Sequence, residues 1–262
     1  DFNPDSDMVS NDELEELDKY ALMKLDEVLE IARNAFEVYD YHTAAHSLHN
    51  FCVVEMSNFY FDVLKDRLYT SAPESKTRSV YNSEETVLYK VLDALTLILT
   101  PILAFTADEI WLAMPHDKSR NGESPLFNEI PQPNFIEADS EFIAKWDRIH
   151  SVRYDVQKAL ELARNEKIIG KPLEAKVSLY ADGELYDFLK SVEAQLPEIF
   201  ITSSVNGEGE VKGDVEGLSV TVSKADGEKC ERCWKFSDTV GQDKNHPTLC
   251  AHCAKVMKEL SL

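Results

Sequence analysis

Cysteine is scarce in this 262-residue chain, which holds five. Small secreted domains that depend on disulfides are far denser in cysteine, so a disulfide framework is disfavoured. Basic side chains are also in the minority, at 27 against 48 acidic ones, and the formal net charge is −21. Because contacts with phosphates need lysine and arginine, this balance argues against a nucleic-acid partner. The distribution weakens that argument, since residues 1–144 carry a net charge of −18 and residues 145–262 only −3.

Long apolar runs are absent as well. The longest, residues 91–105, contains Asp93, two threonines and Pro101 and is too short to span a bilayer, so it predicts a buried helix. The acidic amino end has no feature of a signal peptide. With reduced cysteines, these absences predict a cytoplasmic protein with no membrane partner. Because the chain starts at Asp1 and not at methionine, we expect a piece of a longer protein.

Motifs of common catalytic sites are also missing. No Ser/His/Asp arrangement and no phosphate-binding Walker motif occurs. His42 and His46 have the i, i+4 spacing of a helical metal pair, but Thr43 stands where metalloproteases place glutamate. Surface or packing roles are therefore favoured for both histidines.

The strongest signal is a pair of Cys-x-x-Cys knuckles near the carboxyl end. Sixteen residues separate them, and two knuckles at that distance are typical of a closed, four-coordinate structural zinc site with no position for a catalytic water. Thioredoxin-type redox chemistry needs a single pair on a strand-to-helix turn, and this context is absent. His246 and His252 lie nearby but are not needed to complete the shell. We therefore predict one structural Zn²⁺ held by Cys230, Cys233, Cys250 and Cys253.

Trp234 directly follows the first knuckle. Its ring has two interpretations: an apolar lid over a domain too small to build a core, or a platform on which a nucleobase stacks. The sequence favours the lid.

Helical periodicity dominates the first half of the chain. Apolar residues recur at helical spacing in residues 14–39, 41–66 and 84–100, where Pro101 ends the pattern. Residues 115–133 hold four prolines with little periodicity and predict a loop or linker. We therefore assign residues 1–138 to an antiparallel helical bundle with a trailing linker.

The period changes in the second half. A helix over residues 141–167 precedes alternating segments at 175–179 and 218–222, with a short helix at 185–196 and a strand at 199–205 between them. This pattern predicts a long helix and a small α+β domain over residues 139–223, and a four-cysteine zinc domain over residues 224–262. The fold class is therefore mainly α, with a small α+β part and a zinc finger.

One locally basic spot stands out in the acidic half. Lys65 and Arg67 lie between Tyr60 and Tyr69, with Lys76 and Arg78 beyond. Basic groups between aromatic rings can hold phosphates and stack bases, while an ion-paired helix end explains the same residues equally well.

Four blocks of sequence resemble one family in the same order. They are Phe59-Tyr-Phe-Asp-Val-Leu-Lys-Asp-Arg-Leu-Tyr69, Pro101-Ile-Leu-Ala-Phe-Thr-Ala-Asp-Glu-Ile-Trp111, Ala163-Arg-Asn-Glu-Lys-Ile-Ile-Gly170 and Cys230-Glu-Arg-Cys-Trp234. Over nearly its whole length the chain resembles the carboxy-terminal part of bacterial isoleucyl-tRNA synthetases. The first two blocks also occur in looser form in the valine, leucine and methionine enzymes, so the zinc tail points to isoleucine.

The resemblance implies a class I synthetase bundle that binds the anticodon stem and a zinc-bearing end that helps to hold the anticodon loop. It implies the four knuckle cysteines as zinc ligands, isoleucine tRNA as the partner and a monomeric parent enzyme. The activation signatures of the His-Ile-Gly-His and Lys-Met-Ser-Lys-Ser types are absent, as is the editing domain. ATP therefore belongs to a catalytic domain that the chain lacks, and we expect no catalysis by the chain itself. The predicted tRNA contacts are Lys65, Arg67, Arg78, Arg164, Arg232, Trp234 and Lys235.

Two alternatives from other functional classes stay open. Formamidopyrimidine-type DNA glycosylases have a similar cysteine tail that grips DNA, but they use an amino-terminal proline, whereas this chain begins Asp1-Phe-Asn-Pro4. A zinc-stapled protein-interaction module would also fit the acidic bundle.

Overall fold

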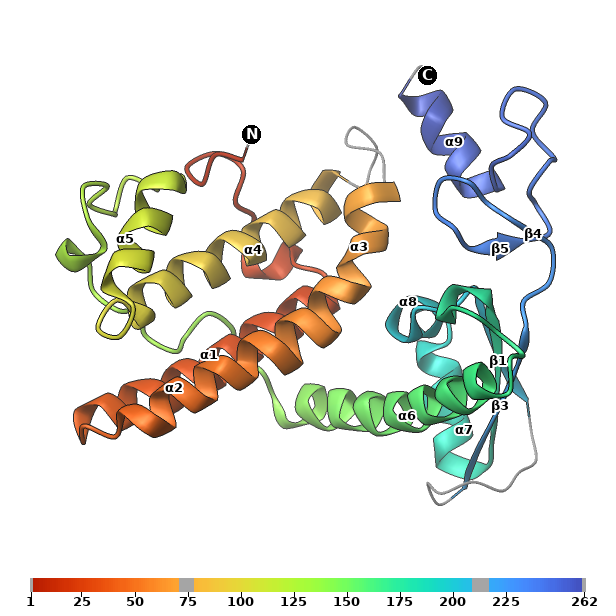
Figure 1. The fold of residues 1–262 in the computed structure, drawn as a ribbon, viewed down its shortest axis with the longest axis horizontal. Coiled ribbons are helices and arrows are strands. Elements are labelled where there is room, and N and C mark those ends of the chain that lie inside the picture. The colour runs from red at the N-terminus through yellow and green to blue at the C-terminus, as the bar shows by residue number, and fades with distance from the viewer. Residues whose placement is uncertain (1, 71–77, 209–216, 261–262) are drawn as a thin grey trace. The chain divides into compact units, whose positions relative to one another are not determined.

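The computed structural model describes residues 2–70, 78–208 and 217–260. These residues form two compact units, the first made of residues 2–64 and 78–139 and the second of residues 65–70, 140–208 and 217–260. Helix dominates the first unit, and the second combines helices with two small sheets (Figure 1). The predicted fold class is confirmed.

The first unit is a helical bundle. Its elements are, in chain order, η1 (Asn11–Glu13), α1 (Glu16–Glu37), α2 (Tyr41–Asn50), the π-helix η2 (Phe51–Tyr60), α3 (Phe61–Thr70), α4 (Arg78–Leu99), α5 (Ala104–Ala113) and η3 (Pro125–Phe127). The last two turns of α3 belong to the second unit. The core lies where α1 packs against α2, η2 and α4, and it includes Leu22, Leu25 and Leu29. Among the described residues, no helix is long and apolar enough to cross a membrane.

A buried carboxylate joins three helices of this bundle. Asp18 of α1 is fully buried; it accepts hydrogen bonds from the Tyr60 hydroxyl of η2 at 2.7 Å and from Ser83 Oγ of α4 at 2.6 Å. Both carboxyl oxygens therefore have hydrogen-bond partners, as buried polar atoms require. The Asp18 network fixes the register of these three helices.

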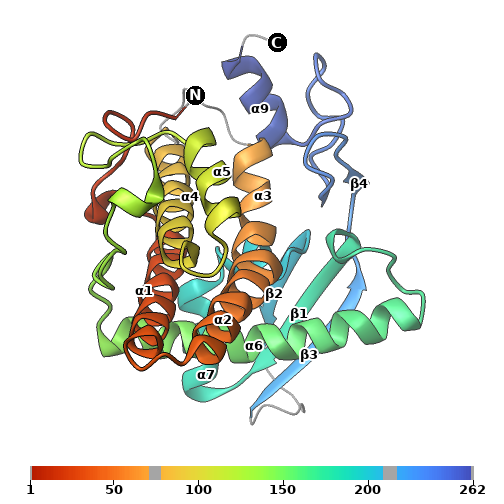
Figure 2. The same ribbon diagram turned by 60° about the vertical axis from the view of Figure 1, so that its left-hand side comes forward.

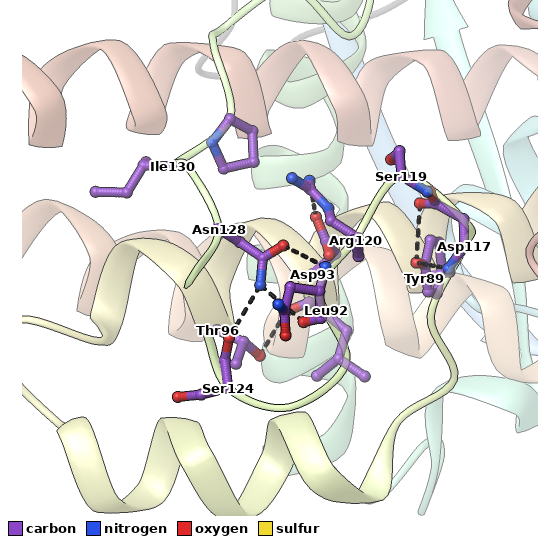
Figure 3. Close-up of polar contacts among 12 residues, drawn as sticks. Tyr89, Leu92, Asp93, Thr96, Asp117, Ser119, Arg120, Ser124, Asn128 and Ile130 are labelled. Carbon is purple, nitrogen blue, oxygen red and sulfur yellow. Dashed lines mark hydrogen bonds and ion pairs between the residues drawn. The ribbon is translucent and has the colours of Figure 1, made fainter. Parts of the chain in front are cut away.

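Residues 114–139, which include the loop or linker predicted over residues 115–133, are fastened to the bundle. The Arg120 guanidinium lies 2.5 Å from a carboxylate oxygen of Asp93, a buried residue of α4 (Figure 3). Asn128 closes the loop on itself: its amide donates to the carbonyls of Asn121 at 2.9 Å and Ser124 at 3.0 Å (Figure 3). Burial raises the pKa of Asp93, and the Arg120 charge partly offsets that effect. We call residues 114–139 the strap, because an ion pair with α4 and hydrogen bonds with α1 hold them against the bundle.

The second unit is built on a three-stranded sheet. Its elements are α6 (Ser140–Asn165), η4 (Pro172–Glu174), β1 (Ala175–Ala181), α7 (Gly183–Val192), α8 (Leu196–Phe200), β2 (Ser204–Glu208), β3 (Leu218–Lys224), β4 (Glu228–Lys229), β5 (Phe236–Ser237) and α9 (Ala251–Glu259). The strand order is β2-β1-β3, with β2 parallel and β3 antiparallel to β1; Val177 faces Val205 on one side and Val222 on the other. Helix α6 packs against β3, and α7 packs against β1 and β2 (Figures 1 and 2).

Alternation along β1 follows the prediction, since Ala175, Val177, Leu179 and Ala181 are buried. The strand predicted over residues 199–205 is wrong in its first half. Ile199 and Phe200 close α8, Ile201 adopts a left-handed conformation with φ of 58°, and β2 begins at Ser204. Apolar residues at 196, 199 and 200 face the core from a helical turn, which a short apolar run cannot distinguish from a strand.

Candidate metal centre

The first knuckle is a tight turn between two short strands. β4 pairs with β5, and between them the Trp234 N–H donates to the Cys230 carbonyl at 2.9 Å while the Cys230 N–H donates to the Lys235 carbonyl at 2.9 Å. Gly227 precedes β4 with a φ of 83°, and a Cβ there would lie 2.3 Å from the backbone carbon of Ser237. Only glycine allows the two strands to approach in this way.

The second knuckle begins a helix. Cys250 is the N-cap of α9 and Cys253 lies in its first turn. The Cys250 N–H donates to Cys230 Sγ at 3.3 Å, which joins the two knuckles.

The four sulfur atoms converge. The Sγ atoms of Cys230, Cys233, Cys250 and Cys253 all lie within 4.8 Å of one another, and all four cysteines are free thiols. A tetrahedral zinc site with Zn–S bonds of about 2.3 Å requires sulfur separations of about 3.8 Å, and Cys233 and Cys250 are 3.9 Å apart. The residues therefore fit a closed zinc site. In the described part of the chain, this is the one group of three or more His, Cys, Asp or Glu side chains placed to hold a metal ion. The group includes neither His246 nor His252.

Backbone amides favour the thiolate form at Cys230. Burial raises the pKa of this thiol, but hydrogen bonds from the backbone of Cys233, Cys250 and Arg232 outweigh it and lower the pKa to about 7. At Cys233 the hydrogen bond with Cys253 and burial raise the pKa. Four thiolates this close repel one another, so a bound dication is needed to hold all of them deprotonated.

Trp234 is exposed beside the cysteine cluster, whereas other apolar residues pack against it. Val240 and Leu249 pack against the cysteine cluster. The Trp234 side chain is 57% exposed, and the Lys229 ammonium lies 5.4 Å from its ring centre. Its backbone is left-handed, with φ of 63°. Such a conformation is uncommon for a bulky residue and marks a site of local strain.

Within the second unit, segments distant in the sequence supply partners for Arg67, Arg232 and Lys235. Arg67 Nε lies 3.1 Å from Glu198 of α8 and Lys235 Nζ 2.5 Å from Asp66 of α3. Arg232 Nη1 donates to the Thr70 carbonyl at 2.5 Å and lies 3.8 Å from Cys253 Sγ.

The remaining candidates are placed as follows. Lys65 is exposed on α3, and Arg164 is paired with Glu161 at 2.7 Å one turn earlier on α6. The side chain of Arg78 lies outside the described residues. The structure thus brings Lys65 and Arg67 into the same unit as Arg232, Trp234 and Lys235.

The helical histidine pair gains no further ligand among the described residues. His42 and His46 are exposed on α2 with ring centres 6.1 Å apart, and His46 Nδ1 lies 3.2 Å from the Asn50 amide. Of the surface and packing roles left open by the sequence, this arrangement agrees with the surface role.

Sequence reasoning missed the partners Asp66, Thr70 and Glu198. Asp66 lies 169 positions from Lys235, and Thr70 lies 162 positions from Arg232, so no local pattern relates them. The local signal was weak: Asp66 stands between Lys65 and Arg67, as it would in an ion-paired helix end.

Comparison with known proteins decides the family. Residues 18–179, more than half of the chain, match the family described as the anticodon-binding domain of tRNA ligase. The chain belongs to this family. Residues 227–256 match the zinc finger found in FPG and IleRS, a family name that covers both classes of enzyme weighed from the sequence. The match over the bundle favours the ligase and does not favour the glycosylase.

Curated relatives agree over the whole chain. Isoleucine–tRNA ligases from Desulforamulus reducens, Caldanaerobacter subterraneus subsp. tengcongensis and Bacillus mycoides are 45%, 43% and 41% identical, each over 99% of this chain. The chain spans 28% of the length of each of these relatives. The resemblance inferred from the four sequence blocks is confirmed.

Proposed function

We propose that the chain recognises the anticodon stem-loop of isoleucine tRNA as part of an isoleucine–tRNA ligase, which joins isoleucine to its tRNA with ATP. The observation that carries this proposal is the presence, on one chain, of an anticodon-binding bundle and the four-cysteine zinc finger. Neither feature alone selects the isoleucine enzyme, since the bundle family serves several tRNA ligases and the finger also serves glycosylases.

The zinc ion would have a structural role. Four cysteines complete its shell and leave no position for a catalytic water. The chain's own residues would fold around the ion and hold Trp234 outward beside Lys229. The exposed ring supports a base-stacking role, because an aromatic face stacks on any nucleobase.

Among the predicted contacts, Lys65 and Trp234 would touch the RNA directly from exposed positions. Arg78 remains a candidate for a phosphate contact, as does Arg164, whose partner Glu161 lies on its own helix. Arg67, Arg232 and Lys235 pair with residues of other elements, so their contribution would include holding this surface in place.

Catalysis would reside elsewhere in the longer enzyme. The activation signatures and the editing domain are absent from this sequence, so ATP would bind to a part that this chain does not contain. We propose a cytoplasmic, monomeric parent enzyme.

Competition between tRNAs tests the proposal. Purified, zinc-loaded chain is titrated with labelled isoleucine tRNA at low salt, and unlabelled isoleucine or valine tRNA is added as competitor. The proposal expects isoleucine tRNA to compete at lower concentration than valine tRNA. Equal competition by both would contradict it.

A further inference from the structure

The carboxyl end of α3 needs partners that the helix cannot supply. The last four carbonyls of a helix have no hydrogen-bond donor within it. In α3 the Thr70 carbonyl is one of these, and Thr70 itself is buried. Its donor is Arg232, at 2.5 Å, from a segment 162 residues further along the chain. A positive side chain there also suits the negative end of the helix dipole.

The same guanidinium contacts the metal cluster. Arg232 Nη1 lies 3.8 Å from Cys253 Sγ, so one nitrogen faces both a zinc-ligand sulfur and the helix carbonyl. A zinc ion with four thiolates carries a net charge of about −2, so it attracts a guanidinium. Free thiols offer only a weak neutral acceptor in its place.

The position of Arg232 in the knuckle links its side chain to metal binding. Arg232 lies between Cys230 and Cys233 within the turn that the ion would close. Without the ion, little else constrains that turn, because such small domains fold with their metal. Opening of the knuckle would withdraw the guanidinium from Thr70.

Two ion pairs surround this contact. Lys235 and Asp66 are 2.5 Å apart, and Asp66 also accepts a hydrogen bond from Thr70 Oγ1 at 3.2 Å. On another side of α3, Arg67 pairs with Glu198 of α8 at 3.1 Å. Partly exposed pairs contribute little energy individually, so they orient the helix end while Arg232 caps it.

We propose that Arg232 is a positioning residue that joins the zinc site to the carboxyl end of α3, so that zinc binding fixes the last turn of this helix. The finger thereby acts as a metal-dependent cap for a helix that lies far from it in the sequence. Resting on the function proposed above, zinc would then affect tRNA binding partly through Lys65, which lies on the capped helix end.

Hydrogen exchange measured by mass spectrometry tests this link without RNA. The full chain is prepared with zinc or treated with EDTA, and peptides covering residues 61–70 are compared with peptides of α1 as an internal reference. The variants are Arg232→Gln and, as a matched control, Arg164→Gln, which removes an arginine paired within its own helix. Zinc content is measured for each sample.

The proposal expects EDTA to speed exchange in the last turn of α3 about 10-fold in the wild type, with α1 unchanged. Arg232→Gln should show the same increase while still holding one zinc per chain, and EDTA should add less than about a further twofold. Arg164→Gln should behave as the wild type.

Unchanged exchange of α3 after EDTA, or in zinc-loaded Arg232→Gln, would overturn the proposal. If Arg232 instead contacts a phosphate alone, Arg232→Gln would leave α3 exchange unchanged and reduce the salt slope of tRNA binding by about one. Because the exchange experiment contains no tRNA, failure of the tRNA proposal would not affect its result.

Discussion

Among the individual residues, Trp234 is held in a conformation that its own side chain disfavours. A left-handed backbone costs a residue with a Cβ on the order of 1 kcal/mol, and glycine avoids this cost. The ring offers little compensation in packing, because Trp234 is more than half exposed. The proposed role of the ring as a stacking surface would account for a large side chain at this position.

Two substitutions of Trp234 separate backbone strain from ring function. Trp234→Gly and Trp234→Ala both remove the ring, so each should weaken tRNA binding by about 1–3 kcal/mol. The glycine variant should unfold with a free energy about 1 kcal/mol higher than the alanine variant, because only alanine retains the left-handed penalty. Chemical denaturation and tRNA titration measure the two effects. Loss of zinc in both variants, with tRNA affinity unchanged once zinc is restored, would show that the ring covers the zinc site and does not stack on RNA.

The ion pair between Asp93 and Arg120 predicts that losing one partner of a buried charge pair destabilises the bundle. Arg120→Met leaves the buried Asp93 carboxylate without its ion pair and should lower the free energy of unfolding by about 2 kcal/mol. Lys118→Met, which removes an exposed partner 3.5 Å from Asp5 in the same strap, should change it by less than about 0.5 kcal/mol. Equal effects of the two variants in urea unfolding would show that the pair does not hold the strap.

At the level of helices and strands, the sequence was informative wherever a period or a spacing is local. Alternation located β1 and β3, Pro101 marked the end of α4 at Leu99, and the spacing of the four cysteines predicted their convergence. The helix predicted over residues 41–66 shows a limit of this approach. Its predicted stripe assumed about 3.6 residues per turn, but ten residues form the π-helix η2, in which hydrogen bonds join residues about five apart. Within η2, Cys52 is only half-buried, whereas Met56 and Phe59 are buried.

Contacts between distant segments could not be predicted in the same way. The strap resembled a linker because its proline content is local information, whereas the Arg120 partner lies 27 residues earlier on α4. The same holds for Arg232, whose spacing to Thr70 carries no periodic signal.

Zinc removal should unfold the zinc finger, from β4 to α9, and leave the bundle folded. Cys230→Ser should lower zinc content below one per chain and expose residues 228–259 to proteolysis, because metal-binding energy is folding energy in such small domains. Cys52→Ser, at a half-buried bundle position, is the matched control and should keep its zinc. Circular dichroism should show the bundle helices retained in both variants. Full zinc content in Cys230→Ser would remove this cysteine from the ligand set.

As a whole, the molecule is an acidic protein that we propose binds an acidic partner. Its net charge of −21 repels tRNA at long range, so a few basic positions must provide the attraction. Six of the seven predicted contact residues lie in the compact unit that contains the zinc finger, and Arg78 is the exception. The sequence of this unit is less acidic than that of the bundle.

The missing activation signatures predict the absence of chemistry. Highly purified chain should show no isoleucine-dependent exchange of pyrophosphate into ATP, since no segment matches the motifs that hold the adenylate. The assay needs a full-length isoleucine–tRNA ligase as positive control. Sustained exchange by the chain alone would contradict the assignment of catalysis to another part of the enzyme.

Binding of an isolated anticodon stem-loop decides whether this chain recognises isoleucine tRNA. A synthetic hairpin with the isoleucine anticodon is titrated into zinc-loaded chain over a range of salt concentrations, beside a hairpin with the same stem and a scrambled loop. We predict tighter binding of the isoleucine loop at every salt concentration and a linear fall of log affinity with log salt, whose slope decreases by about one in Lys65→Gln. Equal affinity for the two hairpins, or no binding at low salt, would contradict recognition of the anticodon by this chain.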